Sequence, residues 1–431
     1  MKRSNQPARR ARTVASRRAA ILLTAVLLCA AAEKLPAWEL RGHVKPQALV
    51  TDIPADSLLQ DLTADPSRDI GIDARVNLGD VAAAWSWQVD YQFLAQQGDQ
   101  TELSQQSGVP GFAPKPIPDD DRRVFDLTHR TSPRDDRVVA HRIDRLYLGY
   151  ATESSVIKIG RQAVSWGNGL IYNPVDFFNP FDPAAIDTEY KTGDDMLYTQ
   201  YLFDSGDDLQ AVWVGRRDDD GNLGNDVSSL AAKYHLFSGT REMDLLASRH
   251  YGDDILAVGG SIDIGGAVWR GDLMLTDSDD ERVASAVLSW SYSLLAWQRN
   301  TSLVVEYFHN GFGIDDGNYG PEALAANPGL TDRLQRGELF TLAQNYLGAA
   351  ATVELHPLWM LTTSLFANLD DDSMLLQLSS RHDLRQELQL LLALNLPSGE
   401  QGSEFGGIDT GIDGRPLSYG ASAFAQLGWY F

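Results

Sequence analysis

The chain has 431 residues, with 36 basic and 59 acidic side chains and a formal net charge of −23. This acidic balance disfavours nucleic acid as a partner, because phosphate backbones are bound by clustered Lys and Arg. The single cysteine, Cys29, falls within the first 32 residues, so the rest of the chain can form neither a disulfide framework nor a cysteine metal site.

The first 32 residues differ in kind from the rest. Seven basic residues and no acidic one precede an apolar run that ends on Ala30, Ala31 and Ala32. This order is typical of a secretory signal peptide, and the run is too short for a membrane span of roughly 20 residues. We predict a signal peptide over 1–32, with a second possible cut after Ala37. The remaining domain, 33–431, then holds 29 basic against 59 acidic residues.

Segments with a side-chain period of two recur along this domain. In the segment 85–93, Trp, Trp, Val, Tyr and Phe alternate with Ser, Gln, Asp and Gln. Successive side chains of a strand point to opposite faces, so this segment has an aromatic face and a polar face. Similar patterns occupy 286–294, 361–368 and 384–396. Many of these segments run about 10 residues, the length at which a tilted strand crosses a bilayer.

About 18 strands are predicted, and 16 fits almost as well. They lie near 38–50, 70–80, 84–95, 140–151, 155–164, 194–204, 207–217, 226–237, 241–250, 254–264, 266–276, 282–294, 299–310, 338–353, 357–369, 372–381, 384–396 and 418–431. Short turns such as 204–207, 251–254 and 370–372 suit the periplasmic side. Long polar loops are expected near 96–139, 165–193, 311–337 and 397–417. This split between short turns and long loops is typical of single-chain bacterial barrels.

The last strand carries the most specific sign of a membrane barrel. From Tyr419 to the terminal Phe431, alternate residues form one apolar face, with Ser422, Gln426 and Gly428 opposite. This ending resembles the C-terminal β-signal of outer-membrane proteins. The resemblance implies that Trp429 and Phe431 form an assembly signal, with the barrel-assembly machinery and outer-membrane lipids as partners. We predict an all-β protein of the Gram-negative outer membrane, a transmembrane antiparallel β-barrel of 16–18 strands. A secreted β-sandwich or propeller would need shorter strands or internal repeats.

The loop near 165–193 differs from the other loops. It holds several Pro and Asn residues, which favour turns, together with Phe177, Phe178 and Phe181. These aromatic side chains, with Trp166, have no reason to face open water, and the surface available inside a barrel is the lumen wall. We therefore predict that this loop folds inward and narrows the pore.

Three short stretches at the start of this region resemble a motif of uncharacterised proteobacterial outer-membrane barrels. They are Gly160-Arg161-Gln162, Ser165-Trp166-Gly167 and Asn173-Pro174-Val175-Asp176. This resemblance covers roughly residues 155–200. More distantly, the motif is similar to the alginate-export type of porin, an 18-stranded barrel that passes an anionic polysaccharide. The resemblance implies a channel without naming its solute. An export pore for an anionic polymer should be lined with Arg and Lys, whereas this chain is strongly acidic.

Charged side chains of the predicted inner face and of the loop are the candidate pore or constriction residues. They are Arg145, Lys158, Arg161, Asp176, Asp182, Asp187, Asp194, Asp195, Lys233, Arg385 and Glu387. Alternation leaves the orientation of the strand that carries Lys158 and Arg161 ambiguous. Two interpretations stay open: an electrostatic filter, or salt bridges that hold the loop to the wall.

No catalytic residue, metal site or cofactor is predicted. His382 and Asp383 are adjacent and would point to opposite faces of a strand, and the eight histidines show no spacing such as H-E-x-x-H. The predicted function is facilitated passage of an unidentified solute through a porin-like channel. The alternative is a non-conducting barrel with a structural, envelope-assembly or surface-binding role.

Overall fold

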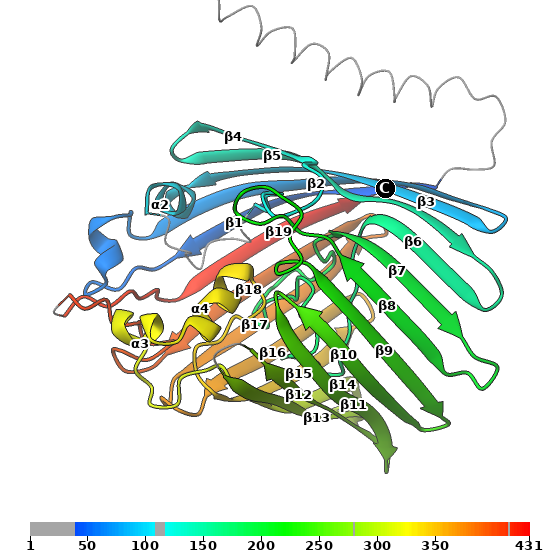
Figure 1. Ribbon diagram of the computed structural model, residues 1–431. Helices are drawn as coiled ribbons and strands as arrows, with labels where there is room; N and C mark the ends of the chain where they lie inside the picture. The colour runs from blue at the N-terminus through cyan, green and yellow to red at the C-terminus, as the bar shows by residue number, and fades with distance from the viewer. Residues whose placement is uncertain (1–38, 108–116, 279–280, 413) are drawn as a thin grey trace, which may run out of the picture. The chain divides into compact units, whose positions relative to one another are not determined.

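The computed structural model describes residues 39–107, 117–278, 281–412 and 414–431. The predicted signal peptide over 1–32 lies outside these residues. The compact unit Leu40–Phe431 holds almost all the described residues, and its strands form one antiparallel sheet (Figure 1). Among the described residues, no helix is long and apolar enough to span a membrane.

The strands are β1 (Glu39–Thr51), β2 (Ser67–Ala82), β3 (Trp85–Gly98), β4 (Thr128–Arg134), β5 (Arg137–Ala151), β6 (Ser155–Gln162), β7 (Asp194–Leu202), β8 (Asp208–Val214), β9 (Ser229–Ser238), β10 (Arg241–His250), β11 (Asp253–Ile264), β12 (Ala267–Asp277), β13 (Arg282–Ala296), β14 (Arg299–His309), β15 (Asn345–His356), β16 (Trp359–Asn368), β17 (Met374–Arg385), β18 (Leu388–Ser398) and β19 (Ser422–Tyr430). The helical segments are η1 (Leu58–Asp61), α2 (Asp99–Ser107), α3 (Pro321–Ala325) and α4 (Pro328–Arg336).

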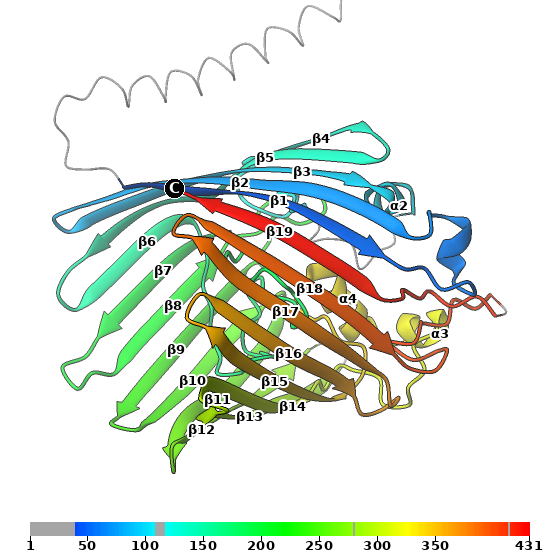
Figure 2. The same ribbon diagram turned by 180° about the vertical axis from the view of Figure 1, so that it is seen from behind.

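Eighteen of the strands close into a barrel. The ring closes where β19 pairs with β1, as Figure 2 shows, and β1 also pairs with β2. Closure leaves the ring without an unpaired edge. The extra strand, β4, pairs with the end of β5 that extends beyond β6. The predicted antiparallel barrel is confirmed, and β4 is an element that the sequence did not predict.

The connections divide into two kinds, one at each end of the barrel. Eight turns of two to five residues lie at the end where β1 begins and β19 finishes, which we call the short-turn end. At Gly265 and Gly266 both φ angles are positive (64° and 84°), as a two-residue hairpin turn requires. The opposite, long-loop end carries the connections 52–66, 99–136, 163–193, 215–228, 310–344 and 399–421. The turns at 251–252 and 369–373 also lie there, so their assignment to the other end was wrong.

Alternation decides which side chains face outward. On β6, for example, Ile157 and Ile159 are exposed, and they lie in register with the exposed Tyr150 and Leu148 of β5. The same outward apolar face runs along β19, whose residues 423, 425, 427, 429 and 431 are all exposed, as predicted. An apolar outer face and a polar inner face are what a membrane barrel requires.

Several predicted strands have wrong boundaries, among them 384–396 and 338–353. The segment 384–396 spans a turn, because β17 ends at Arg385 and β18 begins at Leu388. The segment 338–353 starts seven residues before β15, where the chain is still part of a long loop. In both places leucine-rich alternation continues past the point at which backbone pairing stops, so the side-chain pattern alone cannot locate the strand end.

Candidate functional site

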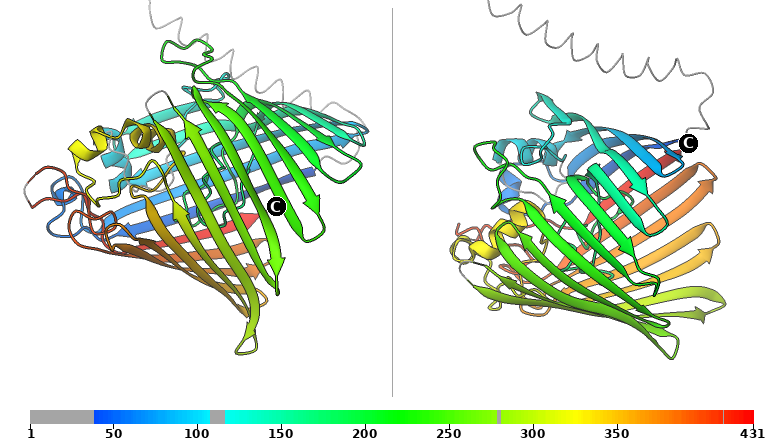
Figure 3. Two further views of the ribbon diagram at one scale, coloured as in Figure 1. Left: turned by 60° about the horizontal axis from the view of Figure 1, so that its bottom comes forward. Right: turned by 45° about the vertical axis from the view of Figure 1, so that its right-hand side comes forward.

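The connection 163–193 between β6 and β7 lies inside the barrel, and we call it the inner loop (Figure 3). Its buried aromatic residues Trp166, Phe177 and Phe178 pack on inward side chains of β8 to β12. Those wall residues are Val212, Val214, Ala231, Leu246, Ile255 and Met274. Phe181 is half-buried. The loop therefore lies against the inner wall, and its aromatic residues supply the apolar contact.

The next stretch of the inner loop is held by carboxylates of the wall. The backbone N–H of Asn168 donates to Asp272 of β12 (2.6 Å). The backbone N–H groups of Leu170, Ile171 and Tyr172 donate to the buried Glu306 of β14, at 2.7, 3.0 and 2.5 Å. A carboxylate is a strong hydrogen-bond acceptor, so these buried backbone N–H groups have the partners that they need. This contact anchors the loop opposite the strands from which it emerges.

The return path of the inner loop follows the other side of the wall. Gln377 of β17 donates to the carbonyl oxygen of Ala184 (2.8 Å). Lys45 of β1 contacts Asp187 at 2.8 Å and Glu189 at 2.5 Å. Burial alone would raise the pKa of Asp187, but the charge of Lys45 and its hydrogen bond lower the pKa of that carboxyl. The loop thus runs round the lumen, with anchors on β12, β14, β17 and β1.

A lysine stabilises the loop from within. The Lys191 ammonium donates to the carbonyl oxygen of Val164 (2.6 Å) and to the carboxylate of Asp176. Burial raises the pKa of Asp176 and lowers that of Lys191, and their mutual attraction opposes both shifts. Lys191, near the end of the loop, is thus tied to its start at Val164 and to its middle at Asp176. Of Lys191 and Asp176, only Asp176 was predicted.

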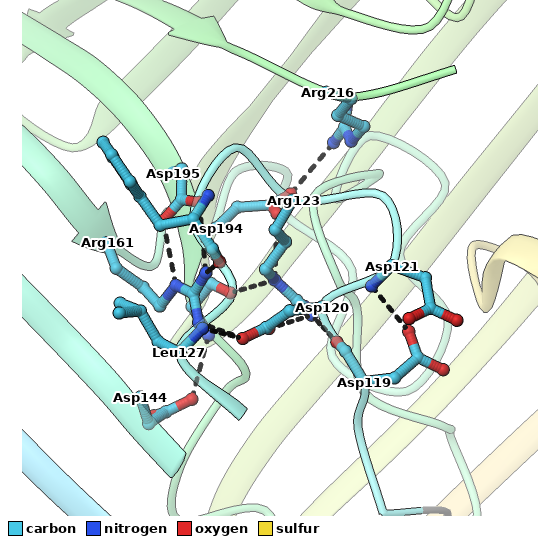
Figure 4. A network of polar contacts seen from close by, with 12 residues as sticks. Asp119, Asp120, Asp121, Arg123, Leu127, Asp144, Arg161, Asp194, Asp195 and Arg216 are labelled. Atoms are coloured by element: carbon cyan, nitrogen blue, oxygen red, sulfur yellow. Dashed lines mark hydrogen bonds and ion pairs between the residues drawn. The ribbon is translucent and has the colours of Figure 1, made fainter. Parts of the chain in front are cut away.

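A buried ion network lies in the wall where β6 ends and β7 begins (Figure 4). Arg161 Nε lies 2.9 Å from Asp195, and its Nη1 lies 2.9 Å from Asp120. Arg216 contacts Asp194 at 3.0 Å, and Arg123 contacts the same carboxylate at 3.4 Å. The segment 119–127 thus covers Arg161, which stands in register with the outward Leu146. The structure brings the predicted residues Arg161, Asp194 and Asp195 together in the wall, away from the inner loop's anchors.

A second cluster lies at the base of the inner loop. Asp144 sits at a bulge of β5 and contacts Arg75 of β2 (2.8 Å) and Arg145 (2.6 Å). Arg145 also donates to the carbonyl oxygen of Lys191, and the Arg75 guanidinium lies 4.2 Å from the ring centroid of Tyr190. Arg145 therefore faces the lumen and contacts the inner loop.

The remaining predicted residues are scattered. Lys158 lies over the ring of Tyr147, and Lys233 lies 3.6 Å from Asp244. Asp182 is an exposed residue of the inner loop. Arg385 is the last residue of β17 and Glu387 lies in the short turn that follows it, and both are exposed.

His382 and Asp383 do not form a pair. The His382 ring stacks on Trp359 at 5.5 Å, whereas Asp383 accepts a hydrogen bond from Gln389 (2.8 Å). In the described part of the chain, no group of three or more His, Cys, Asp or Glu side chains is arranged to hold a metal ion.

Apolar packing covers part of the long-loop end. α3, α4 and the loop after β18 lie at that end, as Figure 1 shows. The buried cluster there comprises Tyr172, Val283, Val287, Phe308, Phe312, Ile314, Tyr319, Leu330, Ala343, Tyr346 and Phe366. It joins the long loops to β13–β16 and to the inner loop.

A buried carboxyl, Glu404, connects these loops. It accepts hydrogen bonds from Tyr346 Oη (2.7 Å), Asn368 Nδ2 (2.9 Å) and the backbone N–H of Leu342 (3.0 Å). Burial raises the pKa of Glu404 to about 7. The folded protein therefore retains this proton at a pH where the unfolded chain has lost it.

We expect the Glu404 proton to make stability pH-dependent. Between the ordinary Glu pKa of about 4.5 and pH 7, the unfolded chain ionises first, so stability should fall as pH rises by about 3 kcal/mol. The Glu404→Gln variant should show a flatter slope in urea unfolding across this window. Glu400→Gln, at an exposed position of the same loop, is the control. An unchanged slope in Glu404→Gln would contradict the assignment.

Several anchors were missed by sequence reasoning. Lys45, Arg75, Asp272 and Lys191 were not singled out, and Glu306 was placed on the polar face of its strand without being selected. The available signal was a single charged residue in the interior of a strand: within 300–308, Glu306 is the one charged side chain. The loop residues that Glu306 and Lys45 contact lie more than 100 residues away from them in sequence. No local pattern can therefore reveal these pairings.

No family model matches the chain, and no curated protein matches it in sequence. Solved structures do match. OccAB3 from Acinetobacter baumannii gives a TM-score of 0.53 at 8% identity, covering 92% of this chain and 100% of that chain. OpdL from Pseudomonas aeruginosa gives 0.51 at 11% identity, covering 92% and 99%.

Wzi from Escherichia coli, described as an outer-membrane protein involved in group 1 capsule assembly and a carbohydrate-binding β-barrel, gives 0.50 at 9% identity, covering 90% and 83%. Identities this low establish the fold and no more. The chain has the fold of Gram-negative outer-membrane porins.

Proposed function

We propose that this chain is an outer-membrane channel through which a solute passes by facilitated diffusion, and that the inner loop is its constriction. The observation that supports this most directly is the inner loop, which runs round the wall of a closed 18-stranded barrel and is held by Asp272, Glu306, Gln377 and Lys45. A barrel of this size is wide enough to hold water. A loop fixed to the wall narrows such a lumen without depending on loop mobility.

The arrangement of connections supports an orientation. Single-chain bacterial barrels place short turns in the periplasm and long loops outside the cell. The short-turn end, where β1 begins and β19 finishes, would then face the periplasm. Trp429 and Phe431 lie on the outer face at that end, consistent with their predicted role as an assembly signal.

Single-channel conductance in planar bilayers tests the proposal. The full barrel should give discrete openings, and deletion of residues 170–190 should raise the conductance because it removes most of the inner loop. Deletion of the turn 218–222, in another long-loop connection, is the control and should leave the conductance unchanged. If the full barrel and both deletion variants are folded by circular dichroism but none of them conducts, the channel proposal is wrong.

The second candidate is a non-conducting barrel with a structural, envelope-assembly or surface-binding role. It is favoured by the apolar packing of α3, α4 and the inner loop over β13–β16, which closes that part of the long-loop end. Silence in the bilayer experiment would select this role.

The resemblance to alginate-export porins implies a channel and names no solute, and the acidic balance of the chain argues against an anionic one. Several wall cations are already neutralised: Lys45 by Asp187 and Glu189, Arg75 and Arg145 by Asp144, and Arg161 by Asp120 and Asp195. We therefore infer that these ion pairs hold segments to the wall, which favours the structural interpretation over an electrostatic filter. Ion selectivity of the open channel would measure the net charge that the lumen presents to a solute.

A further inference from the structure

Three aromatic side chains in the lumen each donate a hydrogen bond to a glutamine amide oxygen. The pairs are Tyr147 with Gln88 (2.9 Å), Tyr198 with Gln200 (3.2 Å) and Trp166 with Gln210 (2.8 Å). We call these six residues the aromatic–amide patch. Five of them come from β3, β5, β7 and β8, and Trp166 comes from the inner loop.

The strand register makes the patch continuous along the wall. Gln88 stands opposite Tyr147 across β3 and β5, and Gln200 stands opposite Gln210 across β7 and β8. Lys158 of the intervening β6 stands opposite Tyr198. Neighbouring strands lie about 4.8 Å apart, so the span from β3 to β8 is on the order of 20 Å. This length exceeds a single sugar ring or amino acid.

The patch lies beside the inner loop and is held in place. Tyr198 borders the core formed by Trp166 and Phe178, while the tyrosines and glutamines are half-buried on the lumen face. Gln88 Nε2 donates to Asp90 (2.9 Å), and Gln210 Nε2 donates to Asp208 (2.8 Å). Because the Gln88 and Gln210 amides are held through both their oxygen and their nitrogen, these side chains are ordered before a ligand arrives, which lowers the cost of binding.

Ammonium groups lie at the edge of the patch. Lys158 Nζ is 5.2 Å from the ring centroid of Tyr147, and Lys233 Nζ is 6.0 Å from that of Trp166. The wall therefore presents the two tyrosine rings, amides, carboxylates and ammonium donors within a few rungs of one another, with the buried Trp166 beneath them. A purely apolar solute would make no use of the polar groups, and a small ion would make no use of the rings.

We propose that the aromatic–amide patch binds an oligosaccharide chain as it passes the inner loop. A pyranose ring has an apolar face of C–H groups, suited to an aromatic surface, and a rim of hydroxyls that both donate and accept hydrogen bonds. The patch supplies both kinds of partner along one continuous strip. This inference names a solute class for the proposed channel and so rests on that function.

Isothermal titration calorimetry of the full barrel in detergent, with maltohexaose, cellohexaose and laminarihexaose as probes, tests the patch. At least one hexasaccharide should bind the native barrel. The double variant Tyr147→Leu/Tyr198→Leu should bind it about tenfold more weakly or worse, because the aromatic surface is lost. Tyr147→Phe/Tyr198→Phe keeps the rings and should retain more affinity than the leucine variant.

The matched control lies on the same two strands. Tyr150 of β5 and Tyr201 of β7 face outward and are 40% and 47% exposed, so Tyr150→Leu/Tyr201→Leu should bind like the native barrel. Binding of none of the three probes, or native affinity in the Tyr147→Leu/Tyr198→Leu variant, would overturn the inference. A barrel that binds a probe but never conducts would contradict the proposed channel and support the patch as a binding site. A barrel that conducts but binds no probe would support the channel and contradict the patch.

Discussion

Replacing Arg161 with methionine is expected to destabilise the barrel by about 3–5 kcal/mol, because the substitution leaves the buried carboxylate of Asp195 without an ionic partner and leaves Asp120 with Arg123 alone. The Arg161 guanidinium lies 2.9 Å from both Asp120 and Asp195 and donates to the carbonyl oxygen of Phe125 (2.6 Å). All three charged side chains are almost fully buried. Burial alone would raise the pKa of Asp120, but the hydrogen bond and charge of Arg161 hold it below its usual value. Methionine preserves much of the volume and removes these interactions.

Urea unfolding of the barrel in lipid vesicles, followed by tryptophan fluorescence, measures this loss. The control is Arg122→Met, which breaks the exposed Arg122–Asp219 pair (2.8 Å; side chains 49% and 90% exposed) and should change stability by less than about 1 kcal/mol. The double variant Arg161→Met/Asp195→Leu should lose less than the sum of its single variants, because fewer unpaired charges remain. If Arg161→Met and Arg122→Met behave alike, the network does not stabilise the wall.

Removing the Glu306 side chain is expected to free the inner loop from the far wall. Three consecutive backbone N–H groups, at Leu170, Ile171 and Tyr172, donate to this one carboxylate. Hydrogen bonds to a charged acceptor contribute about 1.5–3 kcal/mol each. Their loss in Glu306→Ala should speed hydrogen exchange at these amides by at least about a hundredfold. If the inner loop is the constriction, channel conductance should also increase.

Glu322→Ala is the control for this substitution, because Glu322 is exposed in the first turn of α3. It should leave both exchange and conductance unchanged. Faster exchange without a change in conductance would support Glu306 as an anchor of the inner loop. The same result would contradict the proposal that the inner loop is the constriction. Native exchange rates in Glu306→Ala would contradict the anchor itself.

The wall network and the inner loop are stabilised in the same way. In both, a segment that is remote in sequence is fixed by a charged side chain that the barrel buries, such as Arg161 for 119–127 and Glu306 for 170–172. A buried charge without a partner raises the free energy of the folded state. Displacing the segment would leave the charge without its partner, so the paired position is favoured. The position of the inner loop is therefore specified by the wall as much as by its own aromatic residues.

The sequence by itself determined the class of fold and the faces of most strands. Alternation is local: along 85–93 or 421–431, each side chain's face follows from its neighbours, so the apolar outer surface and the terminal strand were predictable. The inward packing of Trp166, Phe177 and Phe178 also followed from a local feature, since large aromatic side chains in a polar loop need a surface to cover.

Only the tertiary structure decided how the charges pair. Alternation aligns Arg161 with Ile157 and Ile159 on the outer face, yet the segment 119–127 covers Arg161 and supplies Asp120 as its partner. Lys45 meets Asp187 across 142 residues, and Glu306 meets Ile171 across 135. Such pairings depend on where closure of the barrel brings distant strands and loops, and a period of two carries no information about that placement.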